Sequence, residues 1–312
     1  MDAIALLQLM QIQGIGHATL NRLLFRVQQE GRSPADLLDY RPDDLVYQYS
    51  FRREWADSFL GSRRKSERMA EELADSRVQI IPFDHPKYPT RLQQILGDGA
   101  PPVLFVRGNA DLLRERSAAV VGLRKCSLRG LKSARHCVRQ LAEKNVPVVS
   151  GNAAGVDAAA HQAALEYGGG TLYILAHGIL SFKERPFMKE LGDDLNQAVV
   201  SEFSPRLPWA THAAMQRNRT ICALARAVIV VEAGVQGGSF ATGNYALRLG
   251  VPLFALDYEP VPASAGGNRF LIHKGAHPIK ENQEDIGELV QKAVEKGKCS
   301  GKEIALRLFP DL

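Results

Sequence analysis

The sequence predicts an α/β protein in which a doubly wound, mostly parallel, Rossmann-like sheet follows a small helical domain. Two observations predict the sheet: short apolar runs recur between residues 118 and 256, and amphipathic helical patterns separate them. Strands that are apolar on both faces and alternate with helices are typical of a parallel sheet covered on both sides. A helical pattern that gives way to a short strand only at Val78 predicts the preceding domain. The six apolar runs are Ala118–Val121, Val146–Val149, Leu172–Leu175, Val199–Val200, Ala227–Val231 and Val251–Leu256.

The N-terminal segment is expected to be helical. Residues 2–27 have a helical pattern that Gly14-Ile15-Gly16 interrupts, and this stretch resembles a helix-hairpin-helix in a SAM-like domain. The glycine turn of that motif presents backbone N–H groups to a nucleic-acid phosphate, and a plain helical hairpin explains the same residues equally well. Ser33-Pro34 predicts the start of a further helix, and residues 52–73 predict one long polar helix.

The pattern changes near residue 80. Val78–Pro82 predicts a short strand, the proline-bounded turn at residues 85–89 cannot continue a helix, and residues 101–106 are extended. We therefore expect a helical domain (1–80), an extended Rossmann-like domain (81–285) and a short helical tail (286–312).

Composition and charge suit a protein with a polyanionic partner. The 312 residues are 45% hydrophobic, which is enough for one full α/β domain and a smaller one. The net charge is +5; residues 1–88 hold 12 Lys and Arg against 13 Asp and Glu, and the remaining residues hold 27 against 21. The basic excess therefore belongs to the larger domain, and nucleic acid, a nucleotide or an acidic membrane surface would each fit it.

Several functional classes lack the residues they need. No G-x-S-x-G, H-E-x-x-H or Walker-type phosphate loop occurs, and the first glycine turn lacks G-x-G-x-x-G, so hydrolase, zincin, ATPase and ordinary dehydrogenase activities are not expected. The four cysteines are widely spaced and predict reduced thiols. Neither a signal sequence nor an apolar run long enough to span a membrane is evident. We expect a cytoplasmic protein with no catalytic residue, metal or cofactor.

The first strand of the larger domain ends at a turn suited to anions. Ala118–Val121 runs into Gly122, Arg124 and Ser127, and a helical pattern begins at Ser127. Backbone N–H groups and the helix dipole converge at such a turn, so a phosphate is expected there. Six Lys and Arg and no acid lie between residues 124 and 139. A solvated helix face is the ordinary explanation of such a stripe, and the turn before it favours a functional role.

Other strand ends carry small and polar residues. The second strand is followed by Ser150–Asp157, in which Asp157 is expected to cap the helix that carries His161; pairing of these two side chains is the weaker alternative. The fifth strand is followed by Glu232 and the glycine-rich turn Gly237–Gly243, and residues 216–220 place two arginines around an amide. Arginine binds phosphate bidentately and asparagine can bond a sugar or base edge, which suits a nucleic-acid backbone.

Taken in order, these strings resemble the DNA-processing protein A family (DprA, also called Smf), and the resemblance covers nearly all of residues 5–280. The matching strings are Tyr88–Leu92, Pro101–Gly108, Val121–Ser127, Val149–His161, Ser201-Glu202, Arg217–Arg219 and Ser264–Ala276.

The resemblance implies a non-enzymatic recombination mediator. Such a protein binds single-stranded DNA without reading its sequence, forms a homodimer and loads a RecA-type recombinase onto incoming DNA during natural transformation. On that model phosphate contacts come from Arg124, Ser127 and the Arg217–Arg219 triplet, with Lys274 a weaker candidate. The full set of predicted nucleic-acid-binding residues is Gly122, Arg124, Lys125, Ser127, Gly151, Arg217, Asn218, Arg219, Gly238, Ser239 and Lys274. No membrane partner is expected.

The chain departs from the family pattern, which indicates a divergent member. Leu123 replaces a serine, Ala154 replaces an arginine, residues 177–186 replace a Y-P-x-x-N element, and no C-terminal winged-helix domain is expected. The alternative is a nucleotide sensor or a nucleoside-monophosphate phosphoribohydrolase on the same fold, in which Glu232 or Asp157 would assist glycosidic cleavage. A scaffold in a defence assembly is a third interpretation.

Overall fold

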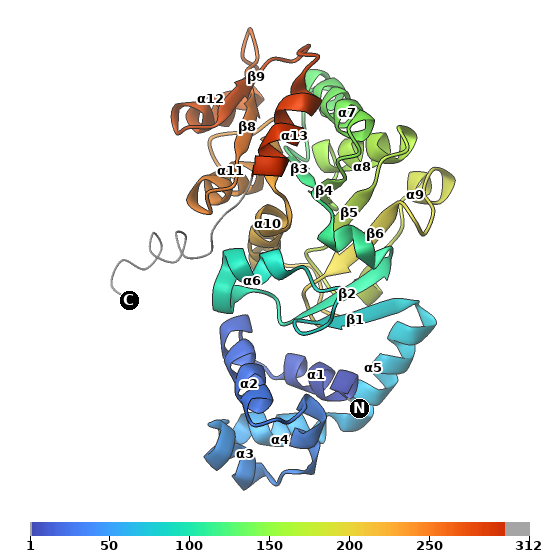
Figure 1. Cartoon of the computed structure of the whole chain (residues 1–312), viewed down its shortest axis with the longest axis vertical. Helices are drawn as coiled ribbons and strands as arrows, with labels where there is room; N and C mark the ends of the chain where they lie inside the picture. Colours follow the sequence, from blue (N-terminus) through green and yellow to red (C-terminus); the bar gives the residue numbers. More distant parts are fainter. Residues whose placement is uncertain (1, 297–312) are drawn as a thin grey trace.

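The alternating strands and helices of the sequence build one nine-stranded sheet in the computed structural model, which describes residues 2–296 (Figure 1). The strand order is β1-β2-β6-β5-β4-β3-β7-β8-β9. The strands from β6 to β9 in this order are parallel, whereas β1 pairs with β2, and β2 with β6, in the antiparallel sense. The predicted α/β class with a mostly parallel sheet and an N-terminal helical region is confirmed.

Every predicted strand is present and begins within two residues of its expected start. The strands are β1 (Val78–Pro82), β2 (Val103–Gly108), β3 (Ala118–Val121), β4 (Val148–Gly151), β5 (Thr171–Ile174), β6 (Gln197–Ser201), β7 (Ala227–Val230), β8 (Leu253–Leu256) and β9 (His277–Ile279). The short edge strand β9 was not expected, because its three residues include a proline and two of them are exposed.

Within residues 2–296 the helices occupy the predicted segments with one difference; the predicted helical tail beyond residue 296 lies outside the described residues. They are α1 (Asp2–Gln11), α2 (His17–Gln29), α3 (Pro42–Tyr49), α4 (Arg53–Gly61), α5 (Arg63–Asp75), α6 (Thr90–Leu96), α7 (Leu128–Glu143), α8 (Val156–Glu166), α9 (Pro186–Glu190), α10 (Thr211–Leu224), α11 (Gly238–Arg248), α12 (Gly266–His273) and α13 (Ile286–Lys296). The single helix predicted over residues 52–73 was wrong, because the chain breaks at Ser62 into α4 and α5. Glycine and serine favour such a break, and the Ser62 hydroxyl donates to the Phe59 carbonyl (2.9 Å).

Two helical layers cover the sheet, and alternate strand residues serve the two layers. Ala118 and Val120 pack with α7, α8 and α13, whereas Ala119 and Val121 pack with α6, α10, α11 and α12. All four side chains are buried, which explains why the strand is apolar on both faces. The helices cover the two faces of the sheet, so the carboxyl ends of the strands are bordered only by loops and helix ends, which form the site.

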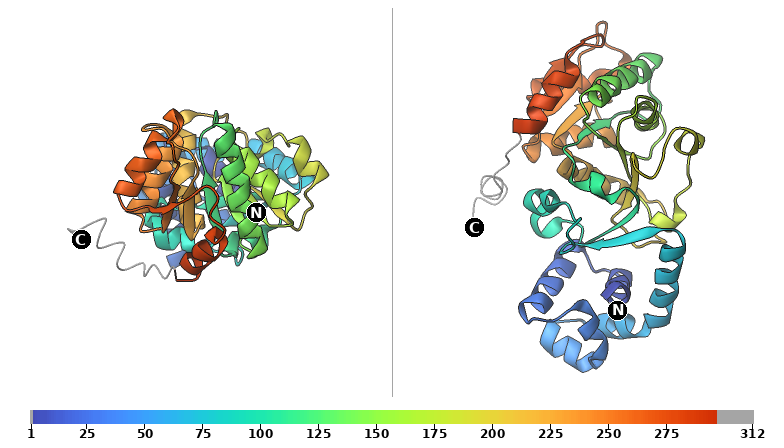
Figure 2. Two further views of the ribbon diagram at one scale, coloured as in Figure 1. Left: turned by 90° about the horizontal axis from the view of Figure 1, so that it is seen from above. Right: turned by 45° about the vertical axis from the view of Figure 1, so that its right-hand side comes forward.

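The N-terminal helices pack directly against the sheet at one end of the molecule (Figure 2). Buried residues of this bundle, including Leu7 and Phe59, share one apolar cluster with Phe105 on β2 and Tyr173 on β5. Ser33 precedes the short 3₁₀ helix Pro34–Asp39, and its N–H donates to the Asp36 carboxylate (2.7 Å). The described residues include no helix long and apolar enough to cross a bilayer.

Candidate functional site

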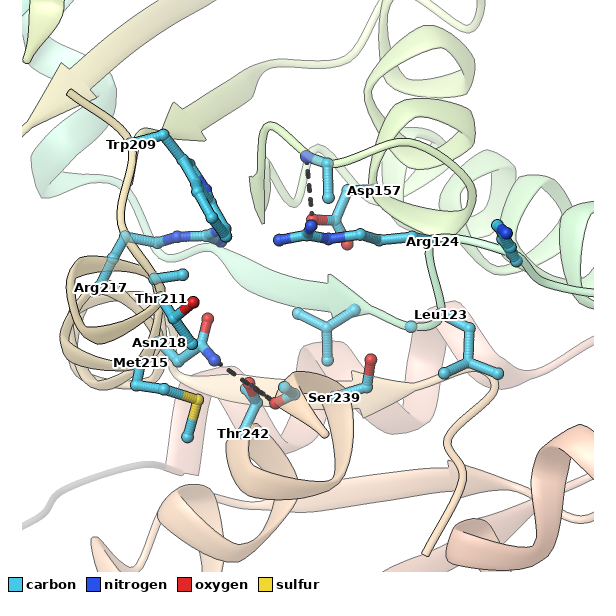
Figure 3. Close-up of a pocket in the computed structure, with 16 residues that line it drawn as sticks. Leu123, Arg124, Asp157, Trp209, Thr211, Met215, Arg217, Asn218, Ser239 and Thr242 are labelled. Atoms are coloured by element: carbon cyan, nitrogen blue, oxygen red, sulfur yellow. Dashed lines mark hydrogen bonds between the residues drawn. The ribbon is translucent and has the colours of Figure 1, made fainter. Parts of the chain in front are cut away.

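A pocket of about 540 Å³ opens at the carboxyl ends of the central strands (Figure 3). It lies where β3 has β4 on one side and β7 on the other, which is the topological switch point where ligands bind in open α/β sheets. We call it the strand-end pocket. Its lining residues are Val121, Gly122, Leu123, Arg124, Lys125, Ala153, Asp157, Trp209, Thr211, Ala214, Met215, Arg217, Asn218, Gly238, Ser239 and Thr242.

The first wall of the pocket is the turn between β3 and α7. Gly122 is required there, because a methyl group at this position would overlap the Val156 side chain. The Val156 N–H donates to the Leu123 carbonyl (3.2 Å), which ties the start of α8 to this turn. Arg124 and Lys125 follow and are exposed. The close packing of two loops therefore places two cations at the mouth of the pocket.

The N-terminus of α7 holds a carboxylate of the protein itself. The Ser127 N–H lies 3.1 and 3.2 Å from the two carboxylate oxygens of Glu232, and its hydroxyl donates to Oε2 (2.7 Å). Glu232 is fully buried, and the Ser127 hydroxyl also caps the helix by accepting from the Gly130 N–H (3.0 Å). The phosphate expected at this helix N-terminus is therefore replaced by Glu232, and Ser127 is not a lining residue of the pocket.

The basic stripe of α7 is largely neutralised by acids from other segments. Arg129 pairs with Glu281, and Arg135 pairs with Glu166. Arg139 pairs with Glu143 (2.8 Å) and Glu284 (3.2 Å). The stripe is therefore an ion-paired helix face, which is close to the ordinary explanation, and only its first members, Arg124 and Lys125, line the pocket.

A buried arginine forms the second wall. Arg217 on α10 is only 6% exposed, and its guanidinium lies over Gly151, where an added methyl group would overlap it. The same methyl group would lie 2.6 Å from Asp157 Oδ2, so the guanidinium and the carboxylate meet above this glycine. Burial lowers the pKa of Arg217, while Asp157 and Glu202 oppose that shift. The Arg217 Nε is buried and has no hydrogen-bond partner among the described residues, and other atoms of the side chain line the pocket.

The sequence predicted that Asp157, the acid beside Arg217, caps its helix, and this prediction was wrong. The N-cap of α8 is Gly155, and Asp157, the second residue of the helix, accepts a hydrogen bond from the Ala153 N–H (3.4 Å). Burial raises the pKa of Asp157 and Arg217 counteracts this, so the carboxyl is a partner for the buried guanidinium.

His161 points away from Asp157 into the core. Its Nε2 donates to the Gly151 carbonyl (2.7 Å), its Nδ1 lies 2.7 Å from the Thr171 hydroxyl, and its ring stacks on Tyr173. Burial lowers the pKa of His161 to about 3. His161 is therefore a neutral packing residue and does not pair with Asp157.

The depressed pKa of His161 predicts acid sensitivity. The folded state binds a proton here only near pH 3, whereas the unfolded chain does so near pH 6.5, so folding stability is full above 6.5 and falls as the pH drops. Between pH 6.5 and 5 we expect this group to account for about 2 kcal/mol of lost unfolding free energy. Urea unfolding at the two pH values, compared in wild type and His161→Leu, checks this. Equal pH dependence in both proteins would contradict it.

The third wall joins α10 to the glycine-rich turn before α11. The Asn218 amide donates to the Gly238 carbonyl (3.4 Å), and the Thr242 hydroxyl donates to the same oxygen (2.8 Å). Gly237 has φ +100°, a conformation that side chains rarely adopt, and it lets α11 begin at Gly238 facing the pocket. Asn218 therefore fixes the edge of the pocket rather than projecting freely into it.

An exposed tryptophan completes the pocket and was missed by sequence reasoning. Arg124 stacks on Trp209, with the guanidinium carbon 5.3 Å from the ring centre. Figure 3 shows these side chains reaching toward each other from opposite walls, with Arg217 beside the tryptophan. Trp209 is 51% exposed. A lone Trp in the loop before α10 carries no recognisable pattern, and neither do Thr211 and Met215.

Besides Ser127, three predicted residues lie outside the pocket lining. Gly151 lies beneath Arg217, and Lys274 lies in a neighbouring hollow, where it donates to Asn244 Oδ1 (3.0 Å). Arg219 lies over Gly99 instead. Successive helix residues point about 100° apart, so the three residues of the Arg217–Arg219 triplet cannot all contact the same phosphate.

Of the two carboxylates that the alternative interpretation named, Glu232 and Asp157, only Asp157 lines the pocket. Glu232 is buried and holds Ser127, so it cannot assist cleavage in the pocket. No group of three or more His, Cys, Asp or Glu side chains that could hold a metal occurs within residues 2–296. The pocket thus combines two arginines, an exposed indole and backbone N–H groups.

The fold and the pocket define a class of Rossmann-like α/β protein with an arginine-lined pocket at the switch point of its sheet. Comparison of the sequence with protein families identifies the family within that class. The chain belongs to the DNA recombination-mediator protein A family, whose model matches residues 79–291. This confirms the resemblance, and the description of the family is that of a recombination mediator.

Individual relatives agree with this assignment. The DNA processing protein DprA of Streptococcus pneumoniae is 37% identical over 205 residues, which are 64% of this chain and 71% of the relative. Protein Smf of Escherichia coli is 34% identical over 237 residues, which are 75% of this chain and 63% of that protein, so the chain spans less than two thirds of it.

Solved structures show the same fold. The X-ray structure of DprA from Streptococcus pneumoniae aligns with a TM-score of 0.74 at 28% identity, covering 91% of this chain and 97% of that one. The DNA processing protein A of Helicobacter pylori, whose structure gives insight into its single-stranded DNA binding mode, aligns with a TM-score of 0.59 at 22% identity. It covers 70% of this chain and 96% of its own, and it bears on the fold alone.

Proposed function

We propose that the strand-end pocket binds the backbone of single-stranded DNA and that the chain acts as a recombination mediator. The observation that carries this is the convergence of Arg124 and Arg217, from two different βα units, on one pocket that also exposes Trp209. Guanidinium groups bind phosphate oxygens, and an indole stacks on any base, so the combination is suited to strands of any sequence.

The pocket is too open and too basic for selective recognition of one base. Arg124 and Lys125 are exposed, and the acid that lines the pocket, Asp157, is buried beside Arg217. Most of the affinity is then electrostatic and decreases with salt. Duplex DNA and free nucleoside monophosphates should bind less well, since the first hides its bases and the second offers one phosphate.

The salt dependence of binding gives a direct test. We expect Arg124→Ala to reduce the slope of log affinity against log salt by about 0.7, the contribution of one phosphate on a single strand. Fluorescence anisotropy with an oligothymidine across a range of salt concentrations measures this slope. Lys132→Ala is the matched control, because Lys132 is an exposed cation of α7 outside the pocket. An unchanged slope in Arg124→Ala would remove this residue from the site.

Further properties are proposed from the family assignment. They are a homodimer, a RecA-type recombinase as partner, natural transformation as the setting, the cytoplasm as the location, and residues 81–285 as the DNA-binding domain.

Exposed apolar side chains at Val235 (52%) and Phe270 (54%) support self-association, and the free thiols of Cys126, Cys137 and Cys222 support a reducing compartment. Light scattering tests the dimer, and recombinase filament nucleation on coated single strands tests the partner.

A further inference from the structure

A second hollow lies in the N-terminal bundle and shares no residue with the strand-end pocket. Its volume is about 380 Å³, and it is formed by the α1–α2 hairpin, α2, the end of α3 and the start of α4. We call it the N-terminal hollow. Its lining includes Ile15, Thr19, Arg22, Arg26, Tyr49 and Trp55.

Two aromatic residues that line this hollow, Tyr49 and Trp55, each have an arginine over the ring; Arg26 also lines the hollow, and Arg52 lies just outside it. Arg26 stands 5.5 Å from the centre of the Tyr49 ring, and Arg52 stands 4.9 Å from the Trp55 ring. Arg22 is exposed, donates to the Ala18 carbonyl (3.2 Å) and has no ion pair among the described residues. The nearby acid, Glu30, accepts from the Tyr49 hydroxyl (2.6 Å) and pairs with Arg26 (3.5 Å). A cationic rim around aromatic rings fits a nucleobase with its flanking phosphate.

Cationic side chains connect the two hollows. Arg219 follows the pocket residues on α10, and its guanidinium lies over Gly99. Asn21 on α2 donates to the carbonyls on either side of that glycine, those of Asp98 and Ala100 (both 2.8 Å). Arg22 is the next residue along α2. These contacts place the guanidinium of Arg219 close to α2, and Figure 1 shows α6 above α2 and α10 above α6.

We propose that the N-terminal hollow binds a nucleobase of the same DNA strand whose backbone occupies the strand-end pocket. Trp55 stacks on the base, and Arg22 and Arg52 bind the phosphates beside it. This inference rests on the proposed function and extends it, and it gives Arg219 the role of a phosphate contact between the two sites. A strand must be long enough to span both sites, so short oligonucleotides occupy the strand-end pocket alone.

The two tryptophans of the chain report on the two sites separately, because Trp209 lies in one and Trp55 in the other. In Trp209→Phe all indole emission comes from Trp55, and in Trp55→Phe it comes from Trp209. We expect an oligothymidine of about 20 nucleotides to quench both variants and one of about five nucleotides to quench only Trp55→Phe, since single-strand sites span about 4–16 nucleotides per module.

Charge removal tests the same idea without touching the aromatic residues. Arg22→Ala with Arg52→Ala is expected to weaken binding of the longer oligothymidine about tenfold and to leave the shorter one unchanged. The matched control is Arg64→Ala with Lys65→Ala, which removes two exposed cations from α5 in the same bundle.

The outcomes separate this inference from the proposed function. If Trp209 responds to the longer strand at saturation and Trp55 does not, the N-terminal hollow is not a strand site and the inference fails alone. A Trp55 signal that responds to purified recombinase and not to DNA overturns it equally, in favour of a protein partner. If neither tryptophan responds to DNA, the proposed function fails.

Discussion

Arg217→Met is expected to weaken binding of a short oligothymidine about 30-fold, the loss of one charge-assisted contact in a desolvated site. The Arg217 side chain is buried, and its Nε has no hydrogen-bond partner within the described residues. The side chain lines the pocket beside Trp209 (Figure 3). Arg217→Lys should restore little, because an ammonium group cannot reproduce the planar guanidinium over Gly151. Fluorescence anisotropy at low salt measures both variants.

A matched variant separates loss of the contact from loss of charge. Arg219 lies two residues further along α10, is exposed and is outside the pocket, so Arg219→Met should bind the short oligonucleotide almost as wild type does. Removing Arg217 also leaves Asp157 and Glu202 without their cation, so melting temperatures must show that the variant is folded at the assay temperature. Full binding by folded Arg217→Met at low ionic strength would overturn the assignment.

Gly155→Ala is expected to lower the free energy of unfolding by about 3 kcal/mol. The backbone has φ +77° at this position, which alanine rarely adopts. The added methyl group would also overlap the Leu123 carbonyl oxygen and lie 2.5 Å from that of Arg124. Both atoms belong to the backbone of the pocket's first wall and cannot move freely. Urea unfolding gives the stability, and a weaker affinity for single strands should accompany the loss.

A control variant for Gly155→Ala measures the cost of the positive φ alone, without steric overlap. Gly168 has φ +70°, and a methyl group there would have no neighbour within 4 Å. Gly168→Ala should therefore cost about 1 kcal/mol, the strain of the conformation alone. If the two variants were equally stable, the close approach of the β4–α8 turn to the first wall would not matter to folding.

The strands could be predicted from the sequence because a parallel strand buried on both faces needs an unbroken apolar run. The glycines of the site could also be predicted, since Gly122 and the glycine-rich turn that starts at Gly237 follow apolar runs in the sequence. Trp209 could not be found, because its role depends on Arg124, 85 residues away, and no local pattern marks it. Glu232 illustrates the opposite case. A helix N-terminus predicts an anion, and the sequence does not reveal that a distant strand end supplies it.

The departures from the family pattern fall near one another in the structure. Arg185 belongs to the unusual segment 177–186, and its guanidinium donates to the Asn152 side chain (3.3 Å) and carbonyl (3.2 Å). Asn152 is in the turn where Ala154 stands in place of the family's arginine. A cation missing from one loop is thus supplied to the same region by another. No local pattern could have shown this, because the residues are about 30 positions apart.

The apolar cluster that joins the N-terminal helices to β2 and β5 has a consequence for how the chain holds together. If the chain were cut near residue 80 and the two parts separated, the rings of Phe105 and Tyr173 would be exposed to water. The N-terminal helices would lose the apolar surface against which they pack. The predicted boundary near residue 80 is therefore crossed by one shared apolar cluster. Any displacement of the N-terminal helices would therefore also move the side chains of β2 and β5 that pack against them.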